Sequence, residues 1–331
     1  MEQIPVSAFI YEFIRLLLSF VLVVGFVAVN GLMLVYMERK VAGRLQCRMG
    51  PMEVGPYGIL QTIVDGIKLM SKQIITPEGA DVPLFWLAPI MALAPAVAVF
   101  VVMPFSETLV ALDINVGVLI VFAYASLGVL SILLAGWGSF NKYSLIGASR
   151  AVAQQVAYEI PMLISVISII LMSHTTQLTG IVHAQKGLWF IFYQPVAFLI
   201  FFICSLAETN RAPFDLVEGE SELTAGFHTE YSGMGFGLFF LGEYANMVVG
   251  ASMATILFLG GWNGPTFGMA GGIFPGVLYF LIKVYILIFI VMWIRWTYPR
   301  LRFDQLLNFN WKILMPFSLV NLIITALVTK L

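Results

Sequence analysis

The sequence is short of charged residues and of cysteine, and it carries no excess of positive charge. Only 11% of its 331 residues are Asp, Glu, Lys or Arg, whereas soluble domains contain about 25%, so a water-soluble fold is excluded. Its two cysteines, Cys47 and Cys204, are too few for an iron–sulfur cluster or a zinc site held by this chain alone. We expect both to be packing residues. The formal net charge of −1 excludes the basic surface that nucleic-acid binding requires.

Motifs for nucleotide binding and nucleophilic catalysis are also missing. The glycines of GMGFG (233–237) open a hydrophobic segment and do not link a strand to a helix, so the chain is not expected to bind NADH itself. The three histidines, His174, His183 and His228, are spread over the sequence and predict no metal site. No nucleophile with a paired base is visible. We therefore expect this chain alone to bind no cofactor.

What the chain has in abundance is hydrophobic residues, at 60% with a mean hydropathy of +0.95. Eight apolar runs approach the roughly 20 residues needed to cross a membrane, at about 10–36, 84–104, 116–137, 151–172, 188–206, 236–260, 276–295 and 312–328. Backbone groups in lipid must form hydrogen bonds within their own segment, and the alternation of a barrel is absent, so these runs are expected to be helices. The sequence predicts an all-α integral membrane protein in which residues 1–331 form one polytopic domain.

The distribution of Lys and Arg predicts an orientation. Most of them fall in one set of loops, which includes the three large loops at 38–83, 207–235 and 296–311. The positive-inside rule places these loops in the cytoplasm and both termini outside, in the periplasm if the membrane is a bacterial inner membrane. The acidic residues Glu2 and Glu12 predict a retained first span and not a cleaved signal peptide.

Segment 57–72 is too short and too polar to span. Gln61, Asp65, Lys68 and Lys72 recur on one face at helical spacing, which predicts an amphipathic helix along the membrane surface. From this periodicity alone, an ordinary interfacial helix remains an alternative to a functional one.

The loop at 207–235 is unusually acidic. It contains six carboxylates against Arg211 alone: Glu208, Asp215, Glu218, Glu220, Glu222 and Glu230. Crowded carboxylates raise one another's pKa values, which lets some of them hold protons near neutral pH. A solvated acidic loop is the alternative, but apolar residues such as Phe214 and Phe227 favour a loop that folds back on the bundle.

Three charged residues are expected at membrane depth, namely Glu159, Glu243 and Lys283. Each needs a polar partner, a water path or a neutralising proton, so each is either a proton-exchanging group or half of a fixed ion pair. Pro161 is expected to free a backbone carbonyl nearby and to admit a polar partner there.

Three stretches carry a resemblance to one family. They read ERKVAGRLQCRMGP (38–51), GPYGILQTIVDGIKLMSK (55–72) and AETNRAPFDLVEGESELTAGFHTEYSGMGFGLFFLGEYANM (207–247). YSLIGASRAVAQQVAYEI (143–160) and WIRWTYPRLRFDQLL (293–307) extend the similarity over nearly the whole chain. In these motifs the sequence resembles the H subunit of the proton-pumping NADH-quinone oxidoreductase, respiratory complex I, and its mitochondrial counterpart, NADH dehydrogenase subunit one.

The resemblance implies a subunit at the junction of the membrane arm and the redox arm. There a long-tailed quinone enters from the bilayer and is reduced by an iron–sulfur cluster on another subunit, while FMN and the remaining clusters also lie elsewhere. The implied partners are the peripheral quinone-site subunits, the antiporter-like membrane subunits, quinone and lipid.

The resemblance also implies roles for individual residues. The quinone tunnel would be lined by the first surface helix and by Glu38, Arg39 and Arg48, with Phe240 and Arg295 nearby. The proton-coupling carboxylates would be Glu38, Asp65, Glu159, Glu208, Asp215, Glu218, Glu220, Glu222, Glu230 and Glu243. Met52, Glu53 and Gln73 depart from the residues common in this family, which leaves the local contacts with peripheral subunits open.

Two other functions remain alternatives at the level of sequence. The first is the homologous membrane subunit of an energy-conserving hydrogenase or a ferredoxin-linked complex, whose scaffold need not reduce quinone. The second is a secondary ion transporter, although the internal repeats typical of transporters are not visible.

Overall fold

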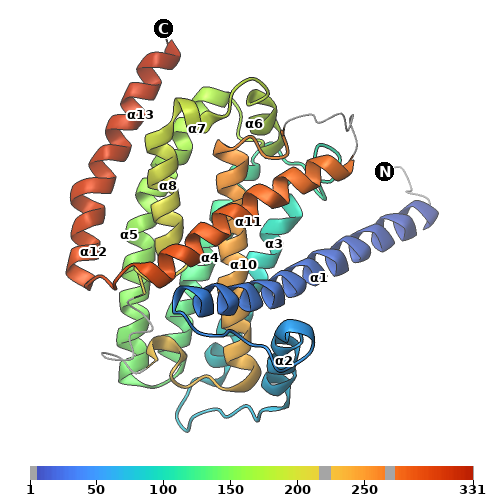
Figure 1. The fold of residues 1–331 in the computed structure, drawn as a ribbon, viewed down its shortest axis with the longest axis vertical. Helices are drawn as coiled ribbons and strands as arrows, with labels where there is room; N and C mark the ends of the chain where they lie inside the picture. The colour runs from blue at the N-terminus through green and yellow to red at the C-terminus, as the bar shows by residue number, and fades with distance from the viewer. Residues whose placement is uncertain (1–5, 216–224, 265–272, 331) are drawn as a thin grey trace.

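The computed structural model describes residues 6–215, 225–264 and 273–330, and within these ranges it contains helices and no strand (Figure 1). The longer helices are α1 (Val6–Leu45), α3 (Val82–Val102), α4 (Gly117–Gly138), α5 (Lys142–Ser173), α8 (Pro195–Glu208), α10 (Gly233–Phe258), α11 (Ile273–Thr297) and α13 (Met315–Lys330). The shorter elements are η1 (Pro56–Gly58), α2 (Gln61–Ser71), α6 (Leu178–Ala184), α7 (Phe190–Tyr193), η2 (Gly226–His228), α12 (Phe303–Phe309) and the π-helical turn η3 (Asn310–Leu314). The prediction of an all-α membrane protein with a separate surface helix is confirmed.

Seven helical segments of the described chain are long and apolar enough to cross a membrane, and the expected span at 188–206 is broken. It consists of the short α7 and the 14-residue α8, which meet at Gln194 and Pro195. A proline disfavours the α conformation of the residue before it, here Gln194, which explains the interruption. The side chain of Gln194 is held by α13, donating to Thr325 at 2.7 Å and accepting from Asn321 at 2.9 Å.

Two helices extend beyond the expected spans. Helix α1 continues to Leu45, so that Glu38 and Arg39 are helical and do not lie in a loop. Segment 303–330 is helical throughout, which converts much of the loop expected at 296–311 into helix. Charged side chains near a helix end can reach the membrane surface, so hydropathy alone underestimates such helices.

Helix α10 stands at the centre of the bundle and contacts α1, α3, α8 and α11. In Figure 1, α5, α8 and α10 run close to the long axis of the molecule, while α1 and α11 cross in front of them obliquely. Helix α13 flanks α5 and α8. The elements α2 and η2 lie at one end of the molecule, which we call the inner end, and α6 and α7 lie at the outer end; both termini are drawn in the half that holds α6 and α7.

Pro161 does free a backbone carbonyl, as expected. Helix α5 continues through the proline, and the carbonyl of Ala157, four residues earlier, accepts a hydrogen bond of 2.6 Å from the buried side chain of Asn310. Next to it, the hydroxyl of Tyr158 donates to the carbonyl of Leu306 at 3.0 Å. The proline therefore creates the polar attachment point at which α12 and η3 dock on α5.

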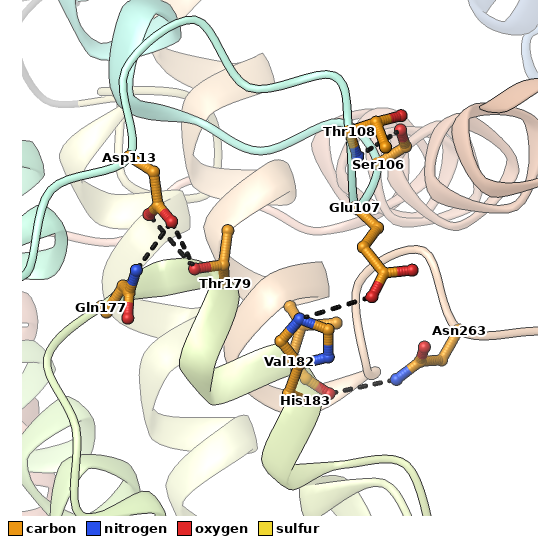
Figure 2. Close-up of polar contacts among 9 residues, drawn as sticks. All are labelled: Ser106, Glu107, Thr108, Asp113, Gln177, Thr179, Val182, His183 and Asn263. Carbon is orange, nitrogen blue, oxygen red and sulfur yellow. Dashed lines mark hydrogen bonds and ion pairs between the residues drawn. The ribbon is translucent and has the colours of Figure 1, made fainter.

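Polar contacts join the loop after α3 to α6 at the outer end (Figure 2). The amide of Gln177 donates to Asp113 at 2.7 Å, and the hydroxyl of Thr179 donates to the same carboxylate at 3.0 Å. His183 lies 3.8 Å from the carboxylate of Glu107, and both side chains are well exposed. These contacts hold the outer loop against the bundle.

Lys283 also serves the outer end. Its ammonium group donates to the carbonyls of Leu259, Gly261 and Asn263 at 2.7, 2.9 and 2.6 Å, and it lies 4.3 Å from the ring centre of Trp189. These carbonyls belong to the chain leaving α10, where no helical partner is available to them. The lysine at membrane depth is therefore a fixed cap for the end of α10.

Candidate functional site

A carboxylate is buried together with two arginines where the C-terminal parts of α1 and α11 meet the middle of α10. Glu38 on α1 accepts hydrogen bonds from Arg211, in the segment after α8, at 2.8 Å and from Tyr244 on α10 at 2.6 Å. Both donors use oxygen Oε2, while Arg295 on α11 bonds to Oε1. Glu38 and Arg211 are 5% and 3% exposed, so water contributes little to their solvation. We call these four residues the Glu38 cluster.

The Glu38 cluster carries a net positive charge when its carboxylate is ionised, because two guanidinium groups face one carboxylate. Burial alone would lower the pKa of Arg211, but Glu38 and the neighbouring Tyr244 and Glu243 raise it, so Arg211 stays charged. Its guanidinium also lies 4.1 Å from the ring centre of Tyr244. Such a surplus of donors suits a ligand with oxygen acceptors.

Phe240 and Arg295, which the resemblance places near the tunnel, both lie at this cluster. Phe240 packs edge-on against Tyr244 with ring centres 5.0 Å apart, one turn earlier on α10. The side chain of Arg295 is 26% exposed, against 3% for Arg211. The cluster is thus sealed at Arg211 and accessible at Arg295.

A second charged contact fixes the surface helix α2 to α1. Arg39 donates to Asp65 at 2.5 Å, and Gln61 donates to the other oxygen of the same carboxylate at 2.9 Å. Burial alone would raise the pKa of Asp65, but the hydrogen bonds from Arg39 and Gln61 lower it below its ordinary value of 3.8. Asp65 therefore holds α2 in place as an ionised group.

Two small adjoining cavities lie between α3, α4, α5, α8 and α10. Glu208, Thr209 and Asn246 line both of them. Glu243 and Asn210 line the second, together with apolar side chains of α3, α4 and α10. We call the pair the acidic cavity, because two carboxylates share its otherwise largely apolar walls.

Helix α5 supports one wall of the acidic cavity. The buried amide of Gln154 donates to the carbonyls of Ala207 and Phe214 at 2.9 and 2.8 Å, and Gln155 donates to the carbonyl of Glu208 at 3.2 Å. These bonds fix the end of α8 and the segment that follows it. Glu159, one turn further along α5, is half-buried, and its charge acts on Glu208.

Glu243 of α10 and the other acidic residues of loop 207–235 have different surroundings. Glu243 faces His228, with 3.7 Å between Oε1 and Nε2. Glu230 accepts a hydrogen bond of 2.6 Å from Asn141 at the start of α5, and Asp215 lies at the end of a described range. The remaining three residues, Glu218, Glu220 and Glu222, lie outside the described residues.

Arg48 is not part of either group. It is exposed and donates to Gln46 at 2.6 Å in the turn that ends α1. Cys47, in the same turn, adopts a left-handed backbone with φ of 53° and is exposed, so the expectation that it packs in the interior is wrong; Cys204 is buried as expected.

Sequence reasoning missed two parts of the site. Tyr244 was not singled out, although it follows Glu243 directly and its hydroxyl bonds to Glu38. Arg211 was noted only as a counter-charge within its loop, whereas its partner lies 173 residues away on α1. The available signal was a lone arginine in an acidic loop, two residues before a proline and three before a phenylalanine.

Fold and site together define a polytopic helical membrane protein with a buried ion cluster and an acid-lined cavity inside its bundle. Residues 18–326 match the family model described as NADH dehydrogenase. The chain is 56% identical over 325 residues to the H subunit of NADH-quinone oxidoreductase from Desulfotalea psychrophila, covering 95% of this chain and 96% of the relative. It is 49% identical to the protein of the same name from Carboxydothermus hydrogenoformans, with 94% and 88% covered. It is 50% identical to the one from Rhodospirillum centenum, with 88% and 87% covered.

The chain belongs to this family, the H subunits of NADH-quinone oxidoreductase. It is therefore a membrane subunit of an enzyme complex. The three relatives carry the oxidoreductase name, which favours this function over the transporter alternative.

Proposed function

We propose that this subunit forms part of the quinone tunnel of its complex and couples quinone reduction to proton translocation through internal carboxylates. The observation that carries the proposal is the arrangement of the Glu38 cluster beside the acidic cavity, with Tyr244 in the first and the adjacent Glu243 in the second. The Glu38 cluster would bind the quinone head group, and the acidic cavity would exchange protons.

The Glu38 cluster fits a quinone head group because a quinone is a flat apolar ring with two carbonyl acceptors. Arg295 is the accessible donor, and the ring of Phe240 supplies an apolar surface next to Tyr244. Pockets for such ligands are mostly apolar with a few well-placed polar groups. Arg39 and Arg48 would line another part of the tunnel, near α2 at the inner end.

The acidic cavity fits proton transfer because carboxylates in an apolar cavity exchange protons in response to neighbouring charges. A change of charge on the quinone would act first on Glu38, then on Glu243 and Glu208, and finally on Glu159. Asp65, Asp215 and Glu230, with Glu218, Glu220 and Glu222, would extend this path on the inner side.

The partners of the chain would be the peripheral quinone-site subunits, which hold the iron–sulfur clusters and FMN, and the antiporter-like membrane subunits. Helix α2 exposes Ile63, Ile67 and Met70 at 45%, 60% and 71%, and an apolar surface of this kind needs lipid or a partner subunit to cover it. We place the complex in a bacterial inner membrane with both termini of this subunit in the periplasm.

Replacing Glu208 with Gln tests the coupling role, since the amide keeps the shape of the side chain and removes its titration. The Glu208→Gln complex should assemble, with NADH–ferricyanide activity unchanged, and should lose most NADH–quinone turnover and proton pumping together. The matched control is Glu107→Gln, the same exchange at an exposed carboxylate of the outer end (Figure 2). Full pumping by Glu208→Gln in inverted vesicles would refute the coupling role.

A further inference from the structure

Arg211 uses only part of its hydrogen-bonding capacity. Nitrogen Nη1 donates to Glu38, whereas Nε and Nη2 have no hydrogen-bond partner among the described residues. The side chain is 3% exposed, so bulk water does not compensate for the missing bonds. Buried donors are rarely left in this state, and an unpaired one calls for an explanation.

Arg211 also stands at the border between the Glu38 cluster and the acidic cavity. Asn210, the preceding residue, lines the acidic cavity, and so does Glu243. The charges of Glu38 and Glu243 both act on Arg211. Arg211 is therefore held by one carboxylate and lies within the electrostatic reach of another.

The second arginine of the cluster has a different position. Arg295 bonds to the other oxygen of Glu38 from α11, and neither cavity is lined by it or by its immediate neighbours. It is also the more exposed of the two. Both arginines neutralise Glu38, but only Arg211 adjoins in sequence a residue that lines the acidic cavity, Asn210.

We propose that Arg211 is a positioning residue that links the two sites: its guanidinium binds Glu38 through Nη1, and its unpaired donors Nε and Nη2 are available to Glu243 and the acidic cavity. When the cavity holds negative charge, Arg211 is drawn toward it and its hold on Glu38 weakens. When a proton neutralises the cavity, Arg211 binds Glu38 fully. The state of the cavity would thereby set how strongly Glu38 and Arg295 are available to the quinone.

This inference rests on the proposed function and names the residue through which its two halves communicate. The groups that face Arg211 are Glu38 from α1, with Tyr244 and Glu243 from α10, while Arg295 of α11 acts through the shared carboxylate. The planar guanidinium holds its donors on separate edges of a fixed fork, so it can address carboxylates in two directions, whereas the compact ammonium of lysine is a point charge that does not reproduce this geometry. Lysine therefore keeps the charge and removes the sharing.

The test is a double-mutant cycle between Arg211→Lys and Glu243→Gln in the assembled complex, with decylubiquinone as the probe. On its own, Glu243→Gln should change the apparent KM for decylubiquinone by about fivefold or more, a typical size for coupling between sites. In the Arg211→Lys background the same exchange should leave KM unchanged. NADH–ferricyanide activity reports assembly throughout.

The matched control is the cycle between Arg295→Lys and Glu243→Gln. Arg295→Lys should itself impair quinone kinetics, but the effect of Glu243→Gln should be as large in its presence as in the native protein. Additive effects in the Arg211 cycle, or equal coupling in both cycles, would overturn the proposal.

A further cycle covers the case in which Arg211→Lys does not assemble. Glu38→Gln and Glu243→Gln should then be non-additive in KM, because Arg211 is the group that connects these two carboxylates, and additivity would overturn the inference. Glu208→Gln decides the proposed function separately. If Glu208→Gln stalls turnover while Glu243→Gln is additive with both Arg211→Lys and Glu38→Gln, the proposed link through Arg211 is refuted and the proposed function is not.

Discussion

The contact between α5 and η2 predicts a defined cost for adding one methyl group. Gly147 of α5 lies against Gly226, and a Cβ atom at position 147 would meet the Gly226 Cα at 2.8 Å and the Phe227 nitrogen at 3.2 Å. The neighbouring Ser144 hydroxyl donates to the carbonyl of Phe227 at 3.3 Å. These obstacles are backbone atoms, which cannot rotate away as a side chain can. Gly147→Ala must therefore shift η2.

The size of the effect follows from this geometry. Ordinary contacts of a Cβ atom begin near 3.4 Å, so the two backbones must separate by about 0.6 Å. Overpacking of this kind costs roughly 1–3 kcal/mol. The better helix propensity of alanine does not offset this cost, because α5 stays helical when η2 opens. We expect η2 to open more easily by roughly 1–3 kcal/mol, which corresponds to about 5- to 150-fold.

Amide hydrogen exchange on the purified complex measures this opening directly. Peptides that cover residues 225–232 should exchange about 5- to 150-fold faster in Gly147→Ala, and quinone turnover should fall because η2 carries His228, which faces Glu243. The control is Gly25→Ala on α1, where an added Cβ meets nothing within 4 Å. Unchanged exchange, or the same change in both variants, would show that the reasoning from the close contact is wrong.

Two further predictions concern the surface helix and the outer end. Asp65→Asn removes the charge that Arg39 binds and should loosen α2, seen as faster proteolysis within 55–75. The pKa of Asp65 lies below its ordinary value, so the native contact contributes its full stability above the ordinary pKa and loses it only as the pH falls through the lowered pKa. Proteolysis of the native protein should therefore not change between about pH 5 and pH 8. A marked change within this pH range would contradict an ionised Asp65 in the contact. Lys283→Met leaves three carbonyls without their donor and should lower the thermal stability of the complex by roughly 1–3 kcal/mol, while Lys186→Met, at an exposed site in the same half of the molecule, should not.

The sequence predicts the helices well because lipid leaves the backbone no other choice. The amphipathic period of α2 and the carbonyl freed by Pro161 follow from equally local rules, and both are found. The partner of that carbonyl, Asn310, could not be named in advance, since it lies 153 residues away. Helix ends were the weakest prediction. Helix α1 continues through Glu38 and Arg39 because both side chains are paired, and a hydropathy profile does not account for such pairing.

The pairing of charges could not be predicted from one sequence. Crowding within loop 207–235 suggested one acidic group, but the fold sends Glu208 to the cavity and Glu230 to Asn141. The counter-charges of Glu38 come from segments 173 and 257 residues away. Spacing along a chain carries no information on such meetings, which depend on how α1 and α11 cross α10.

The long sequence separation within the Glu38 cluster determines the order in which its residues become available during synthesis of the chain. Glu38 is synthesised 257 residues before Arg295, a delay on the order of 10 to 50 s at usual rates of synthesis. At first the carboxylate of Glu38, near the end of α1, has neither of its arginine partners. Once Arg211 has been synthesised, it has that partner but still lacks Arg295. It must stay protonated or keep contact with interfacial water until α11 arrives. A nascent chain that stops before α11 would carry an incompletely neutralised charge in its first helix, a mark by which a membrane protease can distinguish unfinished subunits from finished ones.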